Sequence, residues 1–346
     1  MTQKEIIAGF VKLGVVMRAI ANQRDYDKEC GVSEEQYVRL FELVNHQIHL
    51  NGWFTKHFVL FSLREYGKML QKEELEKFAT KYSFATSPKK IAVIMAGNIP
   101  LVGFHDFMCV LLSGHSIIAK LSSDDARLLP ELVGILTTFD DRFSERITLT
   151  TGFVKNMDAV IATGSDNSLK FFEEYFGKYP HIFRRNRTGV AILDGTETKE
   201  QMEALGLDIF CYFGLGCRNV SHLIVPQDYD FKTFFEGIFK FGDLINHNKY
   251  GNNYDYNRAV YLLNQISIID NNFVLLKETE DLHASLAMVN FHRYSQLSEV
   301  ENYLKAHEQA IQVVVGKNHT PFGCAQTPKI DEFADHVDTM RFLENV

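Results

Sequence analysis

The stretch IAVIMAGNIP, residues 91–100, decides how the middle of the chain folds. Its first five residues form a nearly continuous apolar run, which predicts a strand that is buried on both faces of a sheet. The run ends in a small polar turn that contains Gly97 and Asn98, and a helical pattern then continues to about Ser113. The stretch therefore predicts a strand, a turn and a helix in direct succession.

The same succession recurs downstream, with strands expected at 116–121 and 158–161 and helices at 126–138 and 166–176. Repeated units of this kind are typical of an α/β fold with a doubly wound parallel sheet. Such sheets bind ligands at the carboxyl ends of their strands, where these polar turns fall. No G-x-G-x-x-G fingerprint follows any of the strands, which argues against an ordinary dinucleotide site.

The polar turns have a functional and a structural interpretation. Lys120 and Ser122 have the chemistry to meet ribose and phosphate groups, and the helix start after Gly164 and Ser165 could face a pyrophosphate. Serine at a helix start also satisfies backbone N–H groups, so both serines are explained equally well as N-caps. From the turns alone both interpretations stay open.

Length and composition narrow the class of protein. The chain has 346 residues, 46% of them hydrophobic and 23% charged, which fits a soluble globular protein of two domains. A net charge of -8 argues against nucleic-acid binding. The five cysteines form no C-x-x-C pair and show no metal-ligand spacing, which predicts reduced thiols, a cytoplasmic location and no metal. We expect neither a signal peptide nor a membrane span, because no apolar run is long enough.

The sequence divides into two predicted domains, residues 1–187 and 188–346. Residues 1 to about 87 have a helical, charged pattern and precede the strand-turn-helix units. The second domain has strand patterns at 189–193, 221–225 and 311–315 and helical patterns at 199–207, 231–244 and 299–307. We expect a polar loop at 247–254, and strands or loop edges at 258–263 and 281–291. The terminal segment from residue 331 is expected to close against one of the domains.

One cysteine in the second domain has an unusual setting. Cys217 lies in the stretch DIFCYFGLGCRNVSHLIVP, residues 208–226, just after two glycines and before a strand-like run. Glycines let the backbone adopt conformations that a Cβ forbids and let a substrate approach closely, which suits an accessible nucleophile. The alternative is a small buried cysteine beside a turn, since free cysteine is among the most buried residue types.

In chain order these motifs resemble those of the aldehyde dehydrogenase superfamily and, within it, the LuxC-type acyl-CoA reductases. The family's asparagine turn is matched by Gly97-Asn98-Ile99-Pro100, and its lysine-proline-serine turn by Lys120-Leu121-Ser122. Its threonine-glycine-serine turn is matched by Thr163-Gly164-Ser165, and its glycine-x-x-cysteine nucleophile by Gly214 to Cys217. Its late proline-phenylalanine-glycine-glycine turn is matched by Pro321-Phe322-Gly323, with Cys324 in place of the second glycine.

The resemblance implies an aldehyde-dehydrogenase-like fold, with a Rossmann-type NAD(P)-binding domain in residues 1–187 and a catalytic domain in residues 188–346. It implies Cys217 as the nucleophile and the side chain of Asn98, with the Cys217 backbone N–H, as oxyanion donors. NADPH is the expected cofactor and NADH the alternative. The implied cofactor contacts are Lys120, Ser122, Thr163, Gly164, Ser165 and, as the nearest counterpart of the family's ribose-binding glutamate, Glu280.

One departure from the family pattern indicates whether an acyl-enzyme would be reduced or hydrolysed. Hydrolytic aldehyde dehydrogenases carry a glutamate base before the nucleophile, whereas residues 183–189 read FRRNRTG and contain no carboxylate. Without a base to activate water, an acyl-enzyme should not be hydrolysed readily. The sequence therefore predicts NADPH-dependent reduction of an acyl-CoA thioester to the aldehyde, with a medium or long fatty acyl chain implied by resemblance alone.

Two alternatives remain from the sequence. One is a relative that acts on another activated acyl group, such as an acyl phosphate or an acyl-protein thioester. The other is a catalytically silent family member that serves as an assembly partner. The partners expected are acyl-CoA, an acyl-transferring protein and a second copy of the chain in a homo-oligomer.

Overall fold

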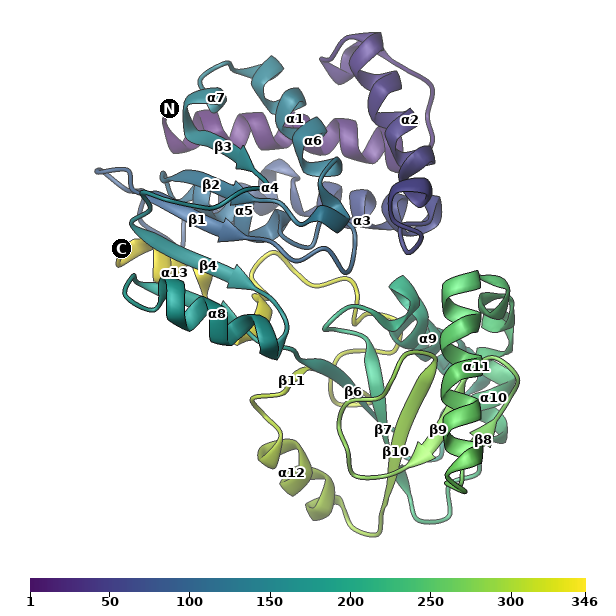
Figure 1. The fold of residues 1–346 in the computed structure, drawn as a ribbon. Coiled ribbons are helices and arrows are strands. Elements are labelled where there is room, and N and C mark those ends of the chain that lie inside the picture. The colour runs from purple at the N-terminus through teal and green to yellow at the C-terminus, as the bar shows by residue number, and fades with distance from the viewer. The chain divides into compact units, whose positions relative to one another are not determined.

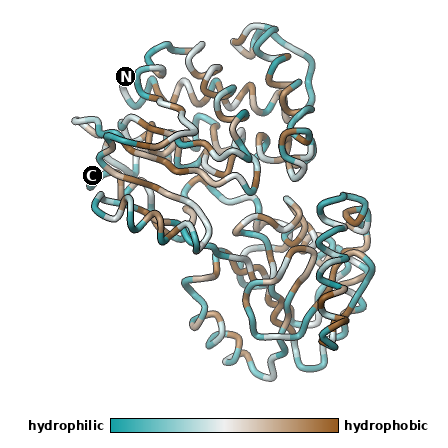
Figure 2. The backbone as a smooth tube through the Cα atoms, viewed as in Figure 1, coloured by the Kyte–Doolittle hydropathy of each residue, from teal (hydrophilic) through white to brown (hydrophobic). Residues whose placement is uncertain are grey.

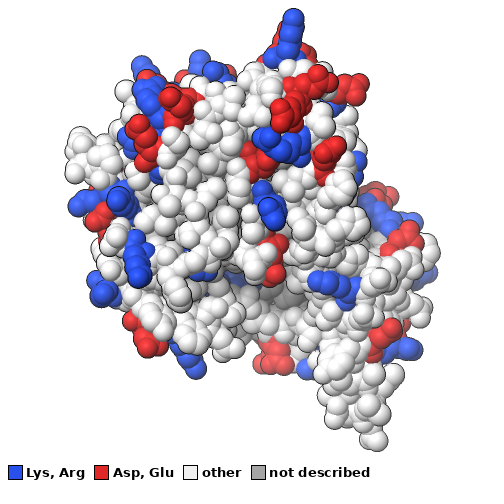
Figure 3. Space-filling view, turned by 45° about the horizontal axis from the view of Figure 1, so that its top comes forward, with Lys and Arg blue, Asp and Glu red and all other residues white. Residues whose placement is uncertain are grey.

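The computed structural model describes residues 1–346, with only the backbone described at residue 166, and the chain forms two compact units. Unit 1 contains Met1–Arg185 and Lys329–Val346, and unit 2 contains Asn186–Pro328 (Figure 1). Within each unit the strands and the inward faces of the helices are the hydrophobic segments (Figure 2). Acidic and basic side chains are interspersed on the face shown in Figure 3.

Unit 1 begins with a layer of helices around a buried first helix. The helices are α1 (Gln3–Ala21), α2 (Glu34–Leu50), α3 (Lys56–Met69) and α4 (Lys72–Ala79). Ile6, Phe10, Leu13 and Met17 of α1 are fully buried, as their helical spacing predicts. Among the described residues no helix is long and apolar enough to cross a membrane.

The sheet of unit 1 is parallel and doubly wound. Its strands are β1 (Lys90–Ile94), β2 (Ser116–Lys120), β3 (Ile147–Thr150), β4 (Ala159–Thr163) and β5 (His181–Arg184), in the order β3-β2-β1-β4-β5. The connecting helices are α5 (Phe104–Leu112), α6 (Leu128–Phe139), α7 (Phe143–Arg146) and α8 (Asp166–Phe176). The expected strand-turn-helix units are confirmed, and β5 is a strand that the sequence pattern did not reveal.

Unit 2 is a second α/β unit built on a mixed sheet. Its strands are β6 (Thr188–Ile192), β7 (Val220–Pro226), β8 (Ile269–Asp270), β9 (Leu275–Glu278), β10 (Met288–Tyr294) and β11 (Ile311–Val315), in the order β11-β6-β7-β10-β9-β8. All neighbouring strands are parallel except β8 and β9. Helices α9 (Lys199–Phe210), α10 (Lys232–Ile238) and α11 (Asn248–Leu263) lie on one face, and α12 (Leu297–Ala306) covers the other (Figure 1).

The expected polar loop at 247–254 and the strand or loop edge at 258–263 are wrong, because both lie in α11. The helix buries only Tyr250, Gly251, Tyr254 and Asn257, a narrow face with no aliphatic residue. Its helical period is therefore hidden among asparagine and glycine residues, which are common in turns. The segment expected as a strand or loop edge at 281–291 is a loop up to Ala287, and β10 then runs from Met288 to Tyr294.

The C-terminal segment, which the sequence grouped with the second domain, packs in unit 1 through a buried ion pair. Arg184 at the end of β5 contacts Asp106 of α5 at 2.6 Å (Nη2 to Oδ1) and 3.1 Å (Nε to Oδ2). The same guanidinium donates to the carbonyl of Ala334 at 2.5 Å and to the hydroxyl of Thr339 at 2.8 Å. Burial opposes ionisation of Asp106, but Arg184 holds the pKa of that carboxyl below its ordinary value.

Removing one member of this pair should strongly destabilise unit 1. Arg184→Ala leaves the Asp106 carboxylate buried without its partner, and such losses typically cost about 3–5 kcal/mol. Urea unfolding monitored by circular dichroism measures the change. Lys240→Ala, which breaks an exposed ion pair with Glu203, is the matched control and should cost only about 0–1 kcal/mol. Equal losses in the two variants would contradict the role given to Arg184.

Candidate functional site

The polar turns of unit 1 meet at one edge of its sheet. Ile94 of β1 pairs with Lys120 of β2 on one side and with Ala162 of β4 on the other, so these strands end at the same level. The turns after them therefore share the carboxyl edge, and the strand order reverses between β1 and β4. This topological switch is where open α/β sheets bind ligands. The predicted residues that the structure brings to this edge are Asn98, Lys120, Ser122, Thr163, Gly164 and Ser165.

The turns after β1 and β2 are in direct contact. A Cβ on Gly97 would lie 2.5 Å from the Oγ of Ser122, so only glycine allows this approach. The Ser122 hydroxyl accepts a hydrogen bond from the backbone N–H of Asp124, and the Ser165 hydroxyl accepts one from Ser168 at the start of α8. Both serines are therefore N-caps. A hydroxyl that accepts such a bond still has a proton to donate, so the cap does not exclude contact with a ligand.

The segment that carries Asn98 is held in place by hydrogen bonds with two buried side chains. The N–H of Leu101, a residue with φ of 60°, donates to Oδ2 of Asp125 at 2.7 Å. The hydroxyl of Ser62 donates to the carbonyl of Pro100 at 2.7 Å. Burial raises the pKa of Asp125 to about 6. The Asn98 side chain itself is exposed. The sequence assigned no role to Asp125, although it belongs to the polar turn after β2, or to Ser62, because the backbone partner of each lies far away in the chain.

In unit 2 the candidate nucleophile lies at the amino edge of the sheet, whereas the polar turns of unit 1 lie at a carboxyl edge. Cys217 is half-buried and precedes β7, so it lies at the amino end of a parallel strand. The residues between α9 and Cys217 have an unusual backbone, since Tyr212, Phe213 and Gly214 have φ values of 52°, 58° and 81° in succession. A left-handed conformation costs a non-glycine residue about 1–2 kcal/mol, so contacts with the surrounding structure must maintain this loop.

The turn that contains Cys324 is fixed to the end of α9. The buried carboxylate of Asp208 accepts hydrogen bonds from the N–H of Gly323 at 2.7 Å and of Ala325 at 2.8 Å. Arg218, directly after Cys217, donates from Nε to the carbonyl of Ala325 at 2.5 Å. The late turn recognised in the sequence therefore lies beside the loop of residues 211–217, the cysteine loop, and its Cys324 is exposed.

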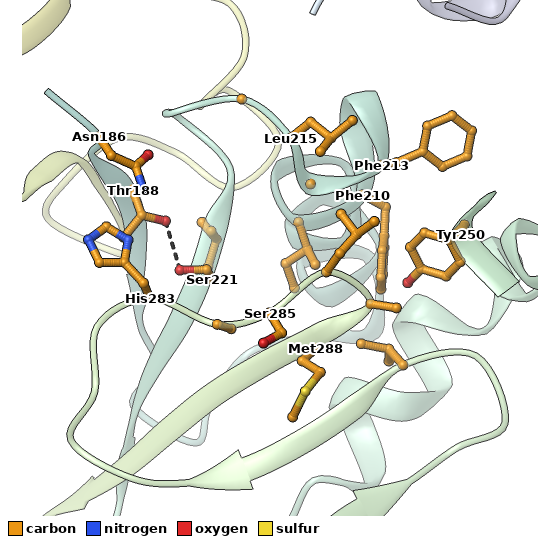
Figure 4. Close-up of a pocket in the computed structure, with 18 of the residues that line it drawn as sticks. Asn186, Thr188, Phe210, Phe213, Leu215, Ser221, Tyr250, His283, Ser285 and Met288 are labelled. Carbon is orange, nitrogen blue, oxygen red and sulfur yellow. Dashed lines mark hydrogen bonds between the residues drawn. The ribbon is translucent and has the colours of Figure 1, made fainter. Parts of the chain in front are cut away.

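A cavity of about 240 Å³ adjoins the cysteine loop, and it lies wholly within unit 2. Gly216, the residue before Cys217, forms part of its lining. Its apolar wall includes Phe210, Phe213, Leu215, Tyr250 and Met288, and its polar side includes Thr188, Ser221, His283 and Ser285 (Figure 4). The hydroxyl of Tyr250 is buried and has no hydrogen-bond partner in the structure. The cavity therefore combines aromatic walls with an unsatisfied polar group, as ligand pockets do.

The segment that carries Glu280 is tied down through its backbone. The carbonyls of residues 280–283 accept hydrogen bonds from the side chains of Tyr303, His222, Ser221 and Asn290. His222 donates from Nδ1 to a carbonyl, so its Nε2 is an acceptor and the contact of 2.6 Å with Nδ1 of His292 must be donated by His292. Burial lowers the pKa of His222 to about 3, which keeps this ring neutral. Glu280 is exposed, and the cavity lining begins three residues later, at His283.

The structure thus distributes the predicted site residues over both units. Asn98, Lys120, Ser122 and residues 163–165 lie in unit 1, and Cys217 and Glu280 lie in unit 2. Among the described residues, no cluster of three or more histidine, cysteine or acidic side chains has the arrangement of a metal site.

Comparisons with known proteins were made by sequence and by fold. Residues 63–233 match the family of acyl-CoA reductases (LuxC). No curated protein matches the chain by sequence. The similar solved structures include an indole-3-acetaldehyde dehydrogenase, AldA, from P. syringae in complex with NAD+, with 10% identity and a TM-score of 0.64 over 91% of this chain and 72% of that one.

Two further structures have the same fold. One is a glyceraldehyde-3-phosphate dehydrogenase, GapN, from Methanocaldococcus jannaschii complexed with NADP (12% identity, TM-score 0.57, covering 91% of this chain and 80% of that one). The other is a propionaldehyde dehydrogenase from Rhodopseudomonas palustris with bound propionyl-CoA (11% identity, TM-score 0.54, covering 99% and 81%). These likenesses establish an aldehyde dehydrogenase fold. Together with the family match, they confirm the resemblance predicted from the motifs.

The pH dependence of stability should reveal the buried carboxyl of Asp208. Burial raises its pKa in the folded protein to about 6, whereas an unfolded aspartate titrates near 3.9. The folded state therefore binds the proton more tightly, and the stabilisation present below pH 4 is lost as the pH rises through 6. Relative to Asp208→Asn, the wild type should lose about 2–3 kcal/mol of unfolding free energy between pH 4 and pH 7. Urea titrations of both proteins at these pH values measure the difference, which should stay constant if Asp208 does not titrate in this range.

Proposed function

We propose that the protein is an acyl-CoA reductase, which uses NADPH to convert a fatty acyl-CoA thioester into the aldehyde through an acyl-enzyme on Cys217. The observation that carries the proposal is the position of Cys217. This residue is half-buried in a tightly held loop, and the residue before it, Gly216, lines the cavity of unit 2. The family match covers this residue and supports the acyl-CoA substrate class. The propionyl-CoA bound to a protein of the same fold supports it as well.

The thiolate of Cys217 attacks the thioester carbonyl, the new carbon–sulfur bond forms, and the thiolate of coenzyme A leaves. Sulfur suits this step because the acyl-enzyme is again a thioester, which remains electrophilic. The oxyanion that develops during the attack requires hydrogen-bond donors in fixed positions. The proposed donors are the Asn98 side-chain amide and the backbone N–H of Cys217. When bound, a nicotinamide cofactor would supply the hydride for the acyl carbon. The bond between that carbon and the Cys217 sulfur then breaks, which releases the aldehyde and restores the Cys217 thiolate.

The surroundings of the cavity favour reduction over hydrolysis. Among the described residues, the cavity lining includes no aspartate or glutamate. In the segment where hydrolytic relatives carry their glutamate, Arg184 is instead buried and paired with Asp106. The cavity therefore offers no carboxylate base to activate a water molecule against the acyl-enzyme.

The residues present fit a nicotinamide dinucleotide. The carboxyl edge of unit 1 offers Lys120, the Ser122 hydroxyl and the start of α8, which are suited to ribose and phosphate groups. Lys120 also provides a positive charge for the additional phosphate of NADPH. In unit 2 the exposed Glu280 is the proposed ribose contact. Proteins of this fold in complex with NAD+ and with NADP support the class of cofactor.

The proposal is tested by incubating the protein with a fatty acyl-CoA without any cofactor and locating the product by peptide mass spectrometry. We expect a persistent acyl adduct on Cys217, followed by aldehyde formation when NADPH is added. Cys217→Ser should lose both. Cys324→Ser, which alters the other solvent-accessible thiol, should retain both. An adduct on Cys324, or NADPH oxidation by Cys217→Ser at the wild-type rate, would refute the assignment. An acyl phosphate tested in parallel identifies the activated acyl group.

The role of Asn98 is tested by its own substitution. Asn98→Ala removes one proposed oxyanion donor, and the loss of one such donor typically lowers kcat by about 10²–10³. Steady-state kinetics with acyl-CoA and NADPH measure this change. Asn345→Ala, which removes an exposed amide bonded within its own helix, is the control and should leave kcat unchanged. A wild-type kcat in Asn98→Ala would exclude the side-chain amide as an oxyanion donor.

A further inference from the structure

The loop between α9 and Cys217 requires an external restraint. It contains three successive residues with positive φ, two of which are the bulky Tyr212 and Phe213. It also follows the carboxyl end of α9, where the last helical carbonyls have no partner within the helix. A loop with this backbone and these unsatisfied carbonyls would rearrange unless other groups bound it.

One buried side chain binds the loop at both ends. Asn219, of which 2% is exposed, donates from Nδ2 to the carbonyls of Asp208 and Ile209 at 3.1 Å and of Cys211 at 2.8 Å. Its Oδ1 accepts a hydrogen bond from the N–H of Gly216 at 2.8 Å. A single amide therefore joins the end of α9 to the residue before the nucleophile. It uses both its donor and its acceptor, which only asparagine or glutamine can supply in this form.

The backbone of Asn219 sets the orientation of the next peptide. Its N–H donates to the carbonyl of Gly216 at 3.0 Å, which closes a turn with Cys217 at its second position. In a trans peptide the carbonyl of one residue and the N–H of the next point in opposite directions. Because the Gly216 carbonyl points into the turn, the N–H of Cys217 points out of it. This is the direction required of a backbone oxyanion donor beside the thiol.

We propose that Asn219 is a positioning residue for the nucleophile, which fixes the Cys217 thiol and backbone N–H by bridging the end of α9 and Gly216. This role rests on the proposed function of Cys217. Asn219 does not touch the substrate and acts through the loop alone.

The test compares Asn219→Ala with Tyr294→Phe. Tyr294 also donates from a buried side chain to a backbone carbonyl of unit 2, that of Leu193. That bond lies at the carboxyl ends of β6 and β10, whereas Cys217 lies at the amino end of β7, the strand that is parallel to both. Both variants lose one buried side-chain anchor, and only Asn219→Ala releases the cysteine loop. Both are assayed at a temperature at which circular dichroism shows them folded.

Two measurements separate positioning from general stability. We expect kcat with acyl-CoA and NADPH to fall by about 10²-fold in Asn219→Ala, as for a misplaced reacting group, with KM close to that of the wild type. We also expect a changed rate of Cys217 alkylation by iodoacetamide, while the exposed Cys324 reacts as before. Tyr294→Phe should leave kcat, KM and the alkylation rate of Cys217 unchanged. If Asn219→Ala does not fold, Asn219→Ser, which keeps one donor and one acceptor, is used in its place.

A folded Asn219 variant with wild-type kcat and wild-type alkylation of Cys217 would overturn the proposal. Equal falls of kcat in the Asn219 variant and Tyr294→Phe would also overturn it, since they would show a general loss of stability. Failure of the proposed function is recognised separately, because the wild type would then form no acyl adduct on Cys217. The alkylation measurement does not depend on acyl-CoA, and it would still report whether Asn219 positions the thiol.

Discussion

The buried pair of Arg184 and Asp106 holds unit 1 together at the point where the chain passes into unit 2. Arg184 ends the last strand of the first sheet, Asp106 belongs to α5, and the same guanidinium binds the C-terminal segment at Ala334 and Thr339. Burying these charges is unfavourable unless every polar atom finds a partner. The pair meets that condition by gathering a strand, a helix and the chain terminus around one guanidinium. Since each partner comes from a distant part of the sequence, the pair exists only in the folded unit.

The ion pair also gives a structural role to the segment that the sequence marks only by its lack of a carboxylate. Residues 183–189 contain no carboxylate. In the structure Arg184 from that stretch is a structural residue of unit 1, and the described residues that line the cavity of unit 2 include no carboxylate. Under the proposed function, an acyl-enzyme on Cys217 would form beside this cavity, in which the described lining offers no carboxylate to activate a water molecule.

The two sheets present their candidate residues at opposite ends of the strands, and the local chemistry differs accordingly. At the carboxyl edge of unit 1 the chain enters α8, whose N-terminal N–H groups suit anions. At the amino edge of unit 2 the chain leaves α9, whose terminal carbonyls require donors. At the carboxyl edge of unit 1, glycine and serine in local turns are enough to satisfy the backbone groups. At the amino edge of unit 2, the carbonyls at the end of α9 need a donor from beyond the loop, and the side chain of Asn219 supplies it.

The amino-acid sequence was enough to predict the alternation of strands and helices, the doubly wound sheet of unit 1 and the motifs around Asn98, Lys120, Gly164 and Cys217. These features depend on residues that are close in the chain, so apolar runs and turn residues reveal them. It did not reveal α11, because that helix buries a narrow face of tyrosine, glycine and asparagine. The positions of Asp125, Asp208 and Asn219, and the return of the C-terminal segment to unit 1, were decided only by tertiary structure. Each of them is a polar group whose partner is a backbone atom or a charge elsewhere in the fold, and no periodic pattern marks such a pairing along the chain.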